Sequence, residues 1–297
     1  MTFVTRHTPN CTGKETSLFL VPDYNRRKSD EHFPYLRCGI CGLIRLSEVP
    51  ARLEDYYKED YYSMPSAARL RALARRDRCR IKTVQHYTQG KRLLEIGPAF
   101  GAFAYQAKQA GFQVDTIEMD QRCCDYLERQ IGVKTVCSSR PEIAIENTGK
   151  HDAIALWHVI EHLPDPWETL DAAAANLDAG GVLFIATPNP EAWQFEMMGK
   201  YWPHLDAPRH LYLLPIDLLT QKVAALGLKR IYQTTTDSEA KRWNRFGWQR
   251  LLMNPLRNKG LRGAAFIGGF ALSLLLSPFE YHGCRGSSYT VAYRKNP

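Results

Sequence analysis

The chain has 297 residues, of which 44% are hydrophobic, so it can bury a complete α/β core and is too apolar for a disordered polypeptide. Its formal net charge of +8 indicates either solvated basic helix faces or an anionic partner: nucleic acid, acidic lipid or a phosphorylated substrate. The first residues contain no apolar run of signal-peptide length and the eight cysteines form no even framework, which favours a cytoplasmic protein without structural disulfides.

Residues 1–62 predict a small, loop-rich module. Cys38-Gly39-Ile40-Cys41 is a C-x-x-C knuckle, and Cys11 stands upstream of it. Zinc sites take two of their four ligands from such a knuckle, so the module either holds a structural zinc ion or buries these cysteines as small apolar side chains. The tyrosines that follow either pack the module onto the rest of the chain or line a substrate mouth: Tyr56, Tyr57, Tyr61 and Tyr62.

Residues 63–88 predict a linking helix, from about residue 66, and residues 89–235 predict an α/β core. Helical stretches alternate with apolar runs, which is typical of a parallel sheet with helices on both faces. The predicted helices include residues 102–110 and 167–177. The predicted strands lie near residues 91–96, 112–118, 133–137, 152–157, 181–186 and 228–235.

A glycine turn is the most informative feature of this core. The first predicted strand leads directly into Gly97 and Gly101, with residues 98–100 between them, and Glu118 ends the next strand. A turn followed by a carboxylate is how α/β sheets hold an adenosine. A dinucleotide needs a glycine in the middle of the turn, where this chain has Pro-Ala-Phe, and Glu95 would repel a pyrophosphate and attract a cation. The turn therefore predicts a cationic adenosine ligand without phosphate, S-adenosylmethionine (SAM).

With these motifs, the chain resembles the class I SAM-dependent methyltransferases over about residues 89–235. Asp152–Pro166 is similar to the fourth strand of that family and the loop after it, and Gly180–Asn189 is similar to the fifth strand. The resemblance implies a Rossmann-like, seven-stranded, mostly parallel sheet whose last strand, near residues 288–294, is antiparallel. It implies a cofactor site formed by Glu95, Gly97, Gly101, Glu118, Met119, Trp157 and His158.

Methyl transfer from a sulfonium needs an aligned acceptor, the exclusion of water and often the removal of one proton. The candidate bases follow the fourth and fifth strands: His158, Glu161, His162, His204, Asp206 and His210. Any one of these histidines could instead be a packed side chain. Arg209-His210-Leu211-Tyr212 resembles the segment that carries the base in deoxysugar C-methyltransferases. That resemblance selects His210 as the base, with His158 and His162 as further catalytic residues.

Some of those C-methyltransferases also carry an N-terminal zinc module. In them the first knuckle is a second C-x-x-C, whereas Thr8 stands in the place of its first cysteine here. The resemblance then makes His7 the nearest substitute for the missing ligand. The implied metal ligands are His7, Cys11, Cys38 and Cys41.

Residues 236–297 predict an insertion followed by the final strand. Lys241 to Arg262 contains seven basic residues and no acidic one, and residues 263–279 carry no charge. As a helix, the uncharged run reaches only ~25 Å, short of a ~30 Å hydrocarbon core. We therefore expect residues 241–280 to lie on an anionic membrane surface; the alternatives are a buried helix and a dimer surface.

The leading hypothesis is a SAM-dependent methyltransferase for a small or lipid-linked acceptor: a glycan, a quinone or an isoprenoid-type intermediate. It would be cytoplasmic, with peripheral contact at the inner membrane surface. The alternatives are an RNA methyltransferase, an NAD-dependent oxidoreductase, and a noncatalytic zinc and membrane binding module with a vestigial core. Nucleic acid is disfavoured because the positive charge is concentrated beside an apolar segment. The methylated atom and the oligomeric state stay open.

Overall fold

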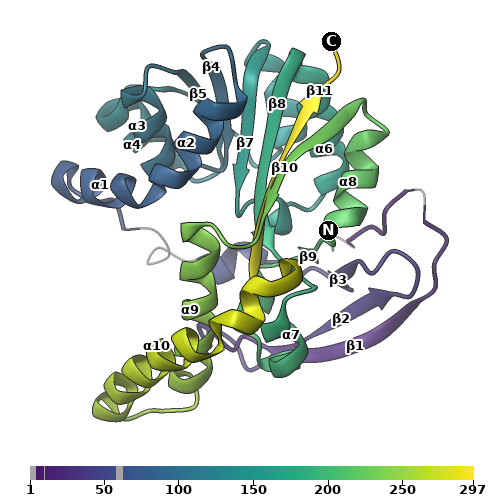
Figure 1. Cartoon of the computed structure of the whole chain (residues 1–297), viewed down its shortest axis with the longest axis vertical. Coiled ribbons are helices and arrows are strands. Elements are labelled where there is room, and N and C mark those ends of the chain that lie inside the picture. Colours follow the sequence, from purple (N-terminus) through teal and green to yellow (C-terminus); the bar gives the residue numbers. More distant parts are fainter. Residues whose placement is uncertain (1–4, 10, 58–62) are drawn as a thin grey trace.

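The computed structural model describes residues 5–9, 11–57 and 63–297, which form a large and a small β-sheet. Seven strands make the large sheet, in the order β10-β11-β8-β7-β4-β5-β6 (Figure 1). The parallel strands are β4 (Arg92–Ile96), β5 (Gln113–Glu118), β6 (Lys134–Cys137), β7 (His151–Trp157) and β8 (Leu177–Pro188). The last strand, β11 (Ser288–Lys295), lies antiparallel between β8 and β10 (Leu228–Thr234), so the predicted Rossmann-like sheet is confirmed.

One strand differs clearly from its predicted bounds. β8 begins at Leu177 rather than near residue 181, and the helix before it ends at Asn176. The pair Gly180-Gly181 lies inside the strand, opposite a shift in register against β7. Because Gly180 has a φ of 74°, it admits this irregularity without ending the strand.

Helices cover both faces of the large sheet. One face packs against α1, α2 and α3, and the opposite face against α6 and α8 (Figure 1). The predicted linking helix is broken into α1 and α2 by a 3-10 turn at Arg75–Asp77. The helices up to β10 are α1 (Ala67–Ala74), α2 (Arg78–Tyr87), α3 (Ala102–Gln109), α4 (Gln121–Tyr126), α5 (Pro141–Ala144), α6 (Pro166–Asn176), α7 (Trp193–Met198) and α8 (Ile216–Ala224).

The small sheet is shared between the N-terminal module and the core. Its strands are antiparallel, in the order β1 (Glu15–Pro22), β2 (His32–Cys38), β3 (Ile44–Leu46) and β9 (Tyr212–Leu213). A two-residue strand leaves no periodic pattern in a sequence, so β9 was not predicted. Because β9 pairs with β3 of the module, the segment just before β9, which contains His210, is attached to the N-terminal module.

The insertion between β10 and β11 is a helical hairpin, α9 (Ser238–Met253) and α10 (Lys259–Tyr281). Gly269 lets the two helices meet at backbone distance, since a Cβ there would lie 2.6 Å from the Cα of Gln249. The uncharged run forms most of α10, but the helix is longer than the ~25 Å predicted from that run alone, since its 23 residues extend about 35 Å. Among the described residues, one helical segment, Lys259–Cys284, is long enough and apolar enough to cross a membrane, judged by length and composition alone.

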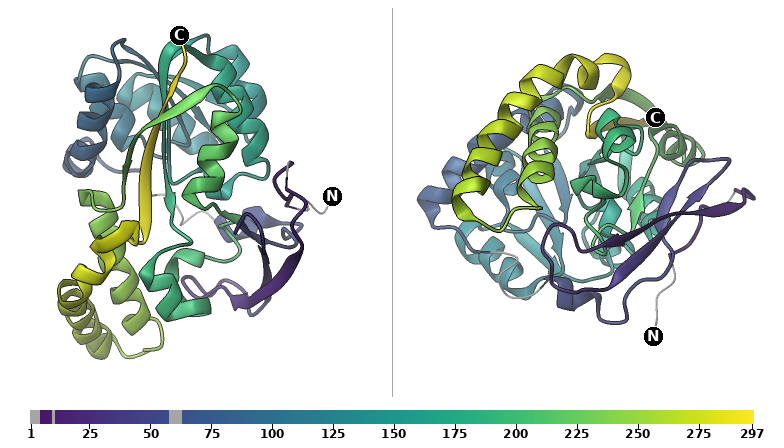
Figure 2. Two further views of the ribbon diagram at one scale, coloured as in Figure 1. Left: turned by 45° about the vertical axis from the view of Figure 1, so that its right-hand side comes forward. Right: turned by 90° about the horizontal axis from the view of Figure 1, so that it is seen from below.

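The hairpin and the small sheet both lie at the end of the large sheet that is away from the C-terminus (Figure 1). Seen from below, they stand on opposite sides of the molecule (Figure 2, right). Strand β11 ends near the C-terminus, at the end of the sheet away from the hairpin, and β8 runs in the opposite direction. The carboxyl ends of β8 and of the strands parallel to it therefore lie at the end where the hairpin and the small sheet are. Open α/β sheets bind ligands at those carboxyl ends.

Candidate functional site

A cavity of about 1630 Å³ lies at the carboxyl ends of the parallel strands. It is lined on one side by the glycine turn and the end of β5, and on another by the segments after β7 and before β9. One face of α9 completes it through Trp243 and Phe246, and the 3-10 turn at Leu53–Tyr57 completes it through Tyr57. The cavity therefore joins the predicted cofactor region to the predicted catalytic histidines.

The glycine turn is closely packed against its neighbours. Gly97 and Gly101 have φ values of 69° and 75°, which other residues rarely adopt. A Cβ on Gly97 would lie 2.6 Å from Val159, and one on Gly101 would lie 2.5 Å from both Leu127 and Ile131. Gly97 lines the cavity, whereas Gly101 is the N-cap residue of α3 and packs behind the turn.

Glu118 holds the turn in place with both carboxylate oxygens. Oε2 accepts a hydrogen bond from the Ala99 amide at 2.9 Å, and Oε1 accepts from the amides of Met119 and Asp120 at 2.8 and 3.0 Å. Burial raises the pKa of Glu118, against the lowering effect of these amides. The side chain lines the cavity and keeps accepting capacity for a ribose hydroxyl.

The other predicted cofactor residues divide into two groups. Met119, which is 60% exposed, and His158 line the cavity. Glu95 and Trp157 are buried in β4 and β7 and do not line it. The Trp157 ring packs 5.3 Å from Phe103 and lies under the guanidinium of Arg80.

His158 lies between two carboxylates. Its Nδ1 is 3.5 Å from Oε1 of Glu161, and its Nε2 is 3.6 Å from Oε1 of Glu239 on α9. Burial opposes the ionisation of Glu239, but its ion pair with Arg80 lowers the pKa to about 2. His158 has a φ of 57°, so the backbone after β7 is strained where the imidazole enters the cavity.

His162 and His210 pack against each other in the cavity wall, with ring centroids 4.6 Å apart. Nδ1 of His162 is 2.9 Å from the carbonyl of Arg209, and Nδ1 of His210 is 2.8 Å from the carbonyl of His204. A carbonyl only accepts hydrogen bonds, so each Nδ1 carries the hydrogen and each Nε2 keeps its lone pair. Burial and the neighbouring His210 lower the pKa of His162 to about 4, which keeps it neutral.

The remaining candidate bases have structural partners. His204 is buried, which lowers its pKa to about 3, and its Nε2 lies 3.1 Å from the carbonyl of Trp243. Burial opposes the ionisation of Asp206, but Arg209 holds its pKa well below the usual range. Glu161 is fully buried, and its Oε2 accepts a hydrogen bond from Thr187 at 2.9 Å.

The tyrosines before α1 take both of the roles considered. Tyr56 packs the module, with its ring against Phe33 and its hydroxyl on Glu31. Tyr57 lines the cavity, and its hydroxyl is 3.0 Å from Nδ1 of His162. Tyr61 and Tyr62 lie outside the described residues.

The α9 side of the cavity was not predicted. Trp243, Phe246 and Arg250 line it, and Glu239 reaches His158. The sequence shows a basic, aromatic segment there, but only the fold turns one face of α9 toward the carboxyl ends of the strands.

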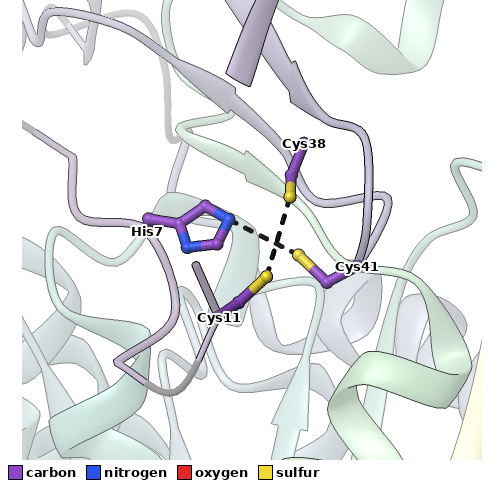
Figure 3. Close-up of side chains that lie close together, drawn as sticks. All are labelled: His7, Cys11, Cys38 and Cys41. Atoms are coloured by element: carbon purple, nitrogen blue, oxygen red, sulfur yellow. Dashed lines mark hydrogen bonds between the residues drawn. The ribbon is translucent and has the colours of Figure 1, made fainter. Parts of the chain in front are cut away.

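The four predicted metal ligands of the N-terminal module form one cluster (Figure 3). Sγ of Cys11 is 3.7 Å from Sγ of Cys38, and Sγ of Cys41 is 3.5 Å from Nε2 of His7. Zn–S bonds of about 2.3 Å place tetrahedral ligands about 3.8 Å apart, so the set has the size of a zinc site. Burial opposes the ionisation of Cys38, but the amides of Cys41 and Ile40 lower its pKa to about 6.

Comparison with known proteins gives the class of this site. Residues 66–233 match a family described as a methyltransferase domain. A SAM-dependent methyltransferase from Archaeoglobus fulgidus has a similar fold, with a TM-score of 0.51 at 15% identity over 76% of this chain and 94% of that one. Phosphoethanolamine N-methyltransferase 2 of Haemonchus contortus, solved with S-adenosyl-L-methionine, gives 0.53 at 14% identity over 97% of this chain and 70% of that one.

Among curated proteins, the chain is similar to ubiquinone biosynthesis O-methyltransferases. That of Bordetella pertussis is 31% identical over 143 residues, or 44% of this chain and 59% of the relative. That of Bordetella avium is 30% identical over 118 residues, or 37% of this chain and 49% of the relative. The chain thus spans about half the length of the curated relatives it matches. Fold, glycine turn and family match together define a class I SAM-dependent methyltransferase, and the chain belongs to this family.

Proposed function

We propose that the protein transfers the methyl group of SAM to an oxygen of a small, quinone-type acceptor. The observation that carries the proposal is one continuous cavity, which runs from Gly97, Glu118 and Met119 to His158 and His210. A cofactor at the glycine turn would direct its methyl group toward an acceptor beside the histidines. The proposed ribose contact is Glu118, with Met119 and Gly97 against the adenosine.

The transfer needs one bond exchange and one proton acceptor. The acceptor oxygen attacks the sulfonium methyl, the S–CH₃ bond breaks as the O–CH₃ bond forms, and the neutral thioether leaves. His210 is the proposed base for the hydroxyl proton, because its Nδ1 donates to the His204 carbonyl and its Nε2 is left to accept. His158 and His162 adjoin the same space and would orient the acceptor.

Two observations favour a quinone-type acceptor. Curated relatives that match this chain include ubiquinone biosynthesis O-methyltransferases. The α9 side of the cavity offers Trp243 and Phe246, whose rings suit a flat, apolar acceptor.

The α9–α10 hairpin supports delivery of the acceptor from a membrane. One face of α9 lines the cavity, while α10 packs on its other side and presents exposed apolar side chains: Leu261, Phe266, Ile267, Phe270, Leu274, Leu275 and Phe279. The C-terminal end of α10 is fixed in the protein, because the buried Glu280 accepts hydrogen bonds from Gln194 and Trp248. We therefore propose peripheral contact at the inner membrane surface by a cytoplasmic enzyme, with residues 241–280 as the contact.

We also propose that the cysteine cluster holds a structural zinc ion. Its four ligand atoms lie within 4.8 Å of one another, and amides of Gly13 and Ile40 donate to the sulfurs of Cys11 and Cys38. This ion would stiffen the module whose sheet β9 completes.

Methyl transfer is tested with SAM labelled in its methyl group and prenylated hydroquinones in liposomes. We expect labelled ether from the prenylated acceptors and less from the same head groups without the tail. Gly97→Val should abolish the product together with SAM binding, because the added side chain meets Val159. A protein that binds SAM but labels none of these hydroquinones would exclude the quinone-type acceptor.

Membrane contact is tested by flotation with anionic and neutral liposomes at low and high salt. Binding should require anionic lipid and weaken with salt. Point charges are preferable to deletion of residues 241–280, because deletion would also remove the cavity lining. Ile267→Asp with Leu274→Asp should abolish flotation, whereas a control with Ala175→Asp and Gln221→Asp, on α6 and α8, should float like the wild type. Wild-type protein that never floats would contradict this part of the proposal.

A further inference from the structure

A second cluster of potential metal ligands lies in the cavity wall. Glu161, His162 and His210 bring a carboxylate oxygen and two imidazole nitrogens within 4.8 Å of one another. They come from two segments, the loop after β7 and the segment before β9, which the amide of Leu211 joins through a 2.7 Å hydrogen bond to the Glu161 carbonyl. The cluster is separate from the cysteine cluster of the N-terminal module.

Both imidazoles are oriented as metal ligands are. Metal-binding histidines commonly donate one ring N–H to a backbone carbonyl and bind the ion through the other nitrogen. The Nδ1 atoms of His162 and His210 are committed to the carbonyls of Arg209 and His204. Among the described residues, neither Nε2 atom has a hydrogen-bond partner, so both lone pairs remain for an ion.

The carboxylate supplies the second, independent observation. Glu161 is 0% exposed, and one of its oxygens, Oε1, has no hydrogen-bond partner among the described residues. The other oxygen accepts from Thr187, and Nδ1 of His158 lies 3.5 Å from Oε1. A buried carboxylate oxygen without a hydrogen bond is costly, and a cation would relieve that cost.

We propose that Glu161, His162 and His210 bind a divalent first-row transition metal ion in the wall of the cavity. Two imidazoles and one carboxylate suit Mn²⁺, Fe²⁺, Co²⁺ or Zn²⁺ and leave coordination positions open. Three such ligand atoms lie about 3 Å apart around one ion, so small side-chain rotations would bring the present atoms, which lie within 4.8 Å of one another, to coordination distance. All three residues line the cavity, so the open positions face the acceptor space.

Bound there, the ion would take an oxygen of the acceptor as a ligand. Coordination lowers the pKa of a bound hydroxyl, and its proton passes to water. His210 then serves as a ligand in place of a base. This role rests on the proposed function, whereas the metal site itself does not.

Mn²⁺ is the probe, because it favours nitrogen and oxygen ligands over the thiolates of the N-terminal cluster. Binding of Mn²⁺ to the full chain is measured by the loss of the free-ion electron paramagnetic resonance signal. We expect one site in the wild type, with affinity at least tenfold weaker in Glu161→Gln and in His210→Gln. Glu168→Gln, a matched change in an exposed carboxylate of the same cavity, should leave it unchanged.

Two further measurements make the result decisive. SAM affinity, determined by calorimetry, should be retained in Glu161→Gln, which shows that the variant is folded and separates this test from the proposed function. Spin-echo modulation of bound Mn²⁺ should show imidazole nitrogen, reduced in His162→Gln. Wild-type protein that binds Mn²⁺ no better than Glu161→Gln, or without nitrogen modulation, would overturn the site and leave His210 as a proton acceptor.

Discussion

Oδ1 of Asp23 lies 2.6 Å from Nη2 of Arg209, and neither side chain is exposed to solvent. This ion pair joins the N-terminal module to the segment that carries His210. Arg209 also bonds to Asp206 at 2.9 Å, and the hydroxyl of Tyr35 donates to the His210 carbonyl at 2.6 Å. The module is therefore a support for the cavity wall rather than an appendage.

Asp23→Ala should destabilise the protein by about 3–5 kcal/mol, because it leaves part of the charge of a buried arginine without its partner. Chemical denaturation measures the free energy of unfolding. The matched control is Asp171→Ala, whose carboxylate is 49% exposed in its ion pair with Lys222, and its cost should stay below about 1 kcal/mol. Equal costs for the two variants would show that the Asp23–Arg209 pair does not support the fold.

Glu118→Ala should weaken SAM binding by about tenfold or more, since a hydrogen bond to a charged group contributes about 1.5–3 kcal/mol. Loss of the contact with the Ala99 amide should also loosen the glycine turn. Calorimetric titration with SAM measures the affinity, with the exposed Glu128→Ala as control. Unchanged affinity in Glu118→Ala would remove this residue from the ribose role.

Zinc should copurify with the protein at one ion per chain, because His7, Cys11, Cys38 and Cys41 complete a tetrahedral set. Elemental analysis should find the ion lost in Cys41→Ser and retained in Cys137→Ser, where the cysteine is exposed and distant from the cluster. Zinc retained at full affinity in His7→Ala would place the fourth ligand elsewhere. Protein prepared without chelators and free of zinc would contradict the site.

Glu239 should make the stability of the fold depend on acid pH. Arg80 lowers the pKa of its carboxyl to about 2 despite burial, below the ordinary value of 4.5. The unfolded chain therefore binds the proton first, and the stabilisation present above about pH 4.5 is lost as the pH falls toward 2. The carboxyl of Glu239 therefore stabilises the fold at neutral pH, and this contribution to stability is absent in strong acid.

The variant Glu239→Gln should be less stable than the wild type at pH 6, and the difference should shrink between pH 4.5 and 3. Urea denaturation at several pH values measures this. Glu128→Gln, at an exposed position, should follow the wild-type curve. A constant difference between Glu239→Gln and the wild type across this range would show that the pKa of this carboxyl is the same in the folded and the unfolded chain.

The sequence by itself determined the class of the fold and its cofactor. Both faces of the large sheet are covered, and residues on either face, such as Leu93 and Leu156, are buried, so the parallel strands appear as apolar runs in the sequence. The spacing of Gly97, Gly101 and Glu118 is likewise local in the chain. Local patterns are set by backbone conformation and burial within one segment. The motifs therefore sufficed to place the chain among the SAM-dependent methyltransferases.

Only the tertiary structure decided which side chains share the cavity. Glu161 and His210 are 49 positions apart in the chain, and β9 and Arg209 bring them together through contacts with the N-terminal module. Trp157 is the last residue of β7 and packs into the core, whereas His158 follows the strand, has a φ of 57° and lines the cavity. Likewise α9 carries a basic segment whose inner face, with Trp243, lines the cavity because the hairpin folds back over the strand ends. Such contacts depend on the packing of distant segments, which leaves no periodic signal in the sequence.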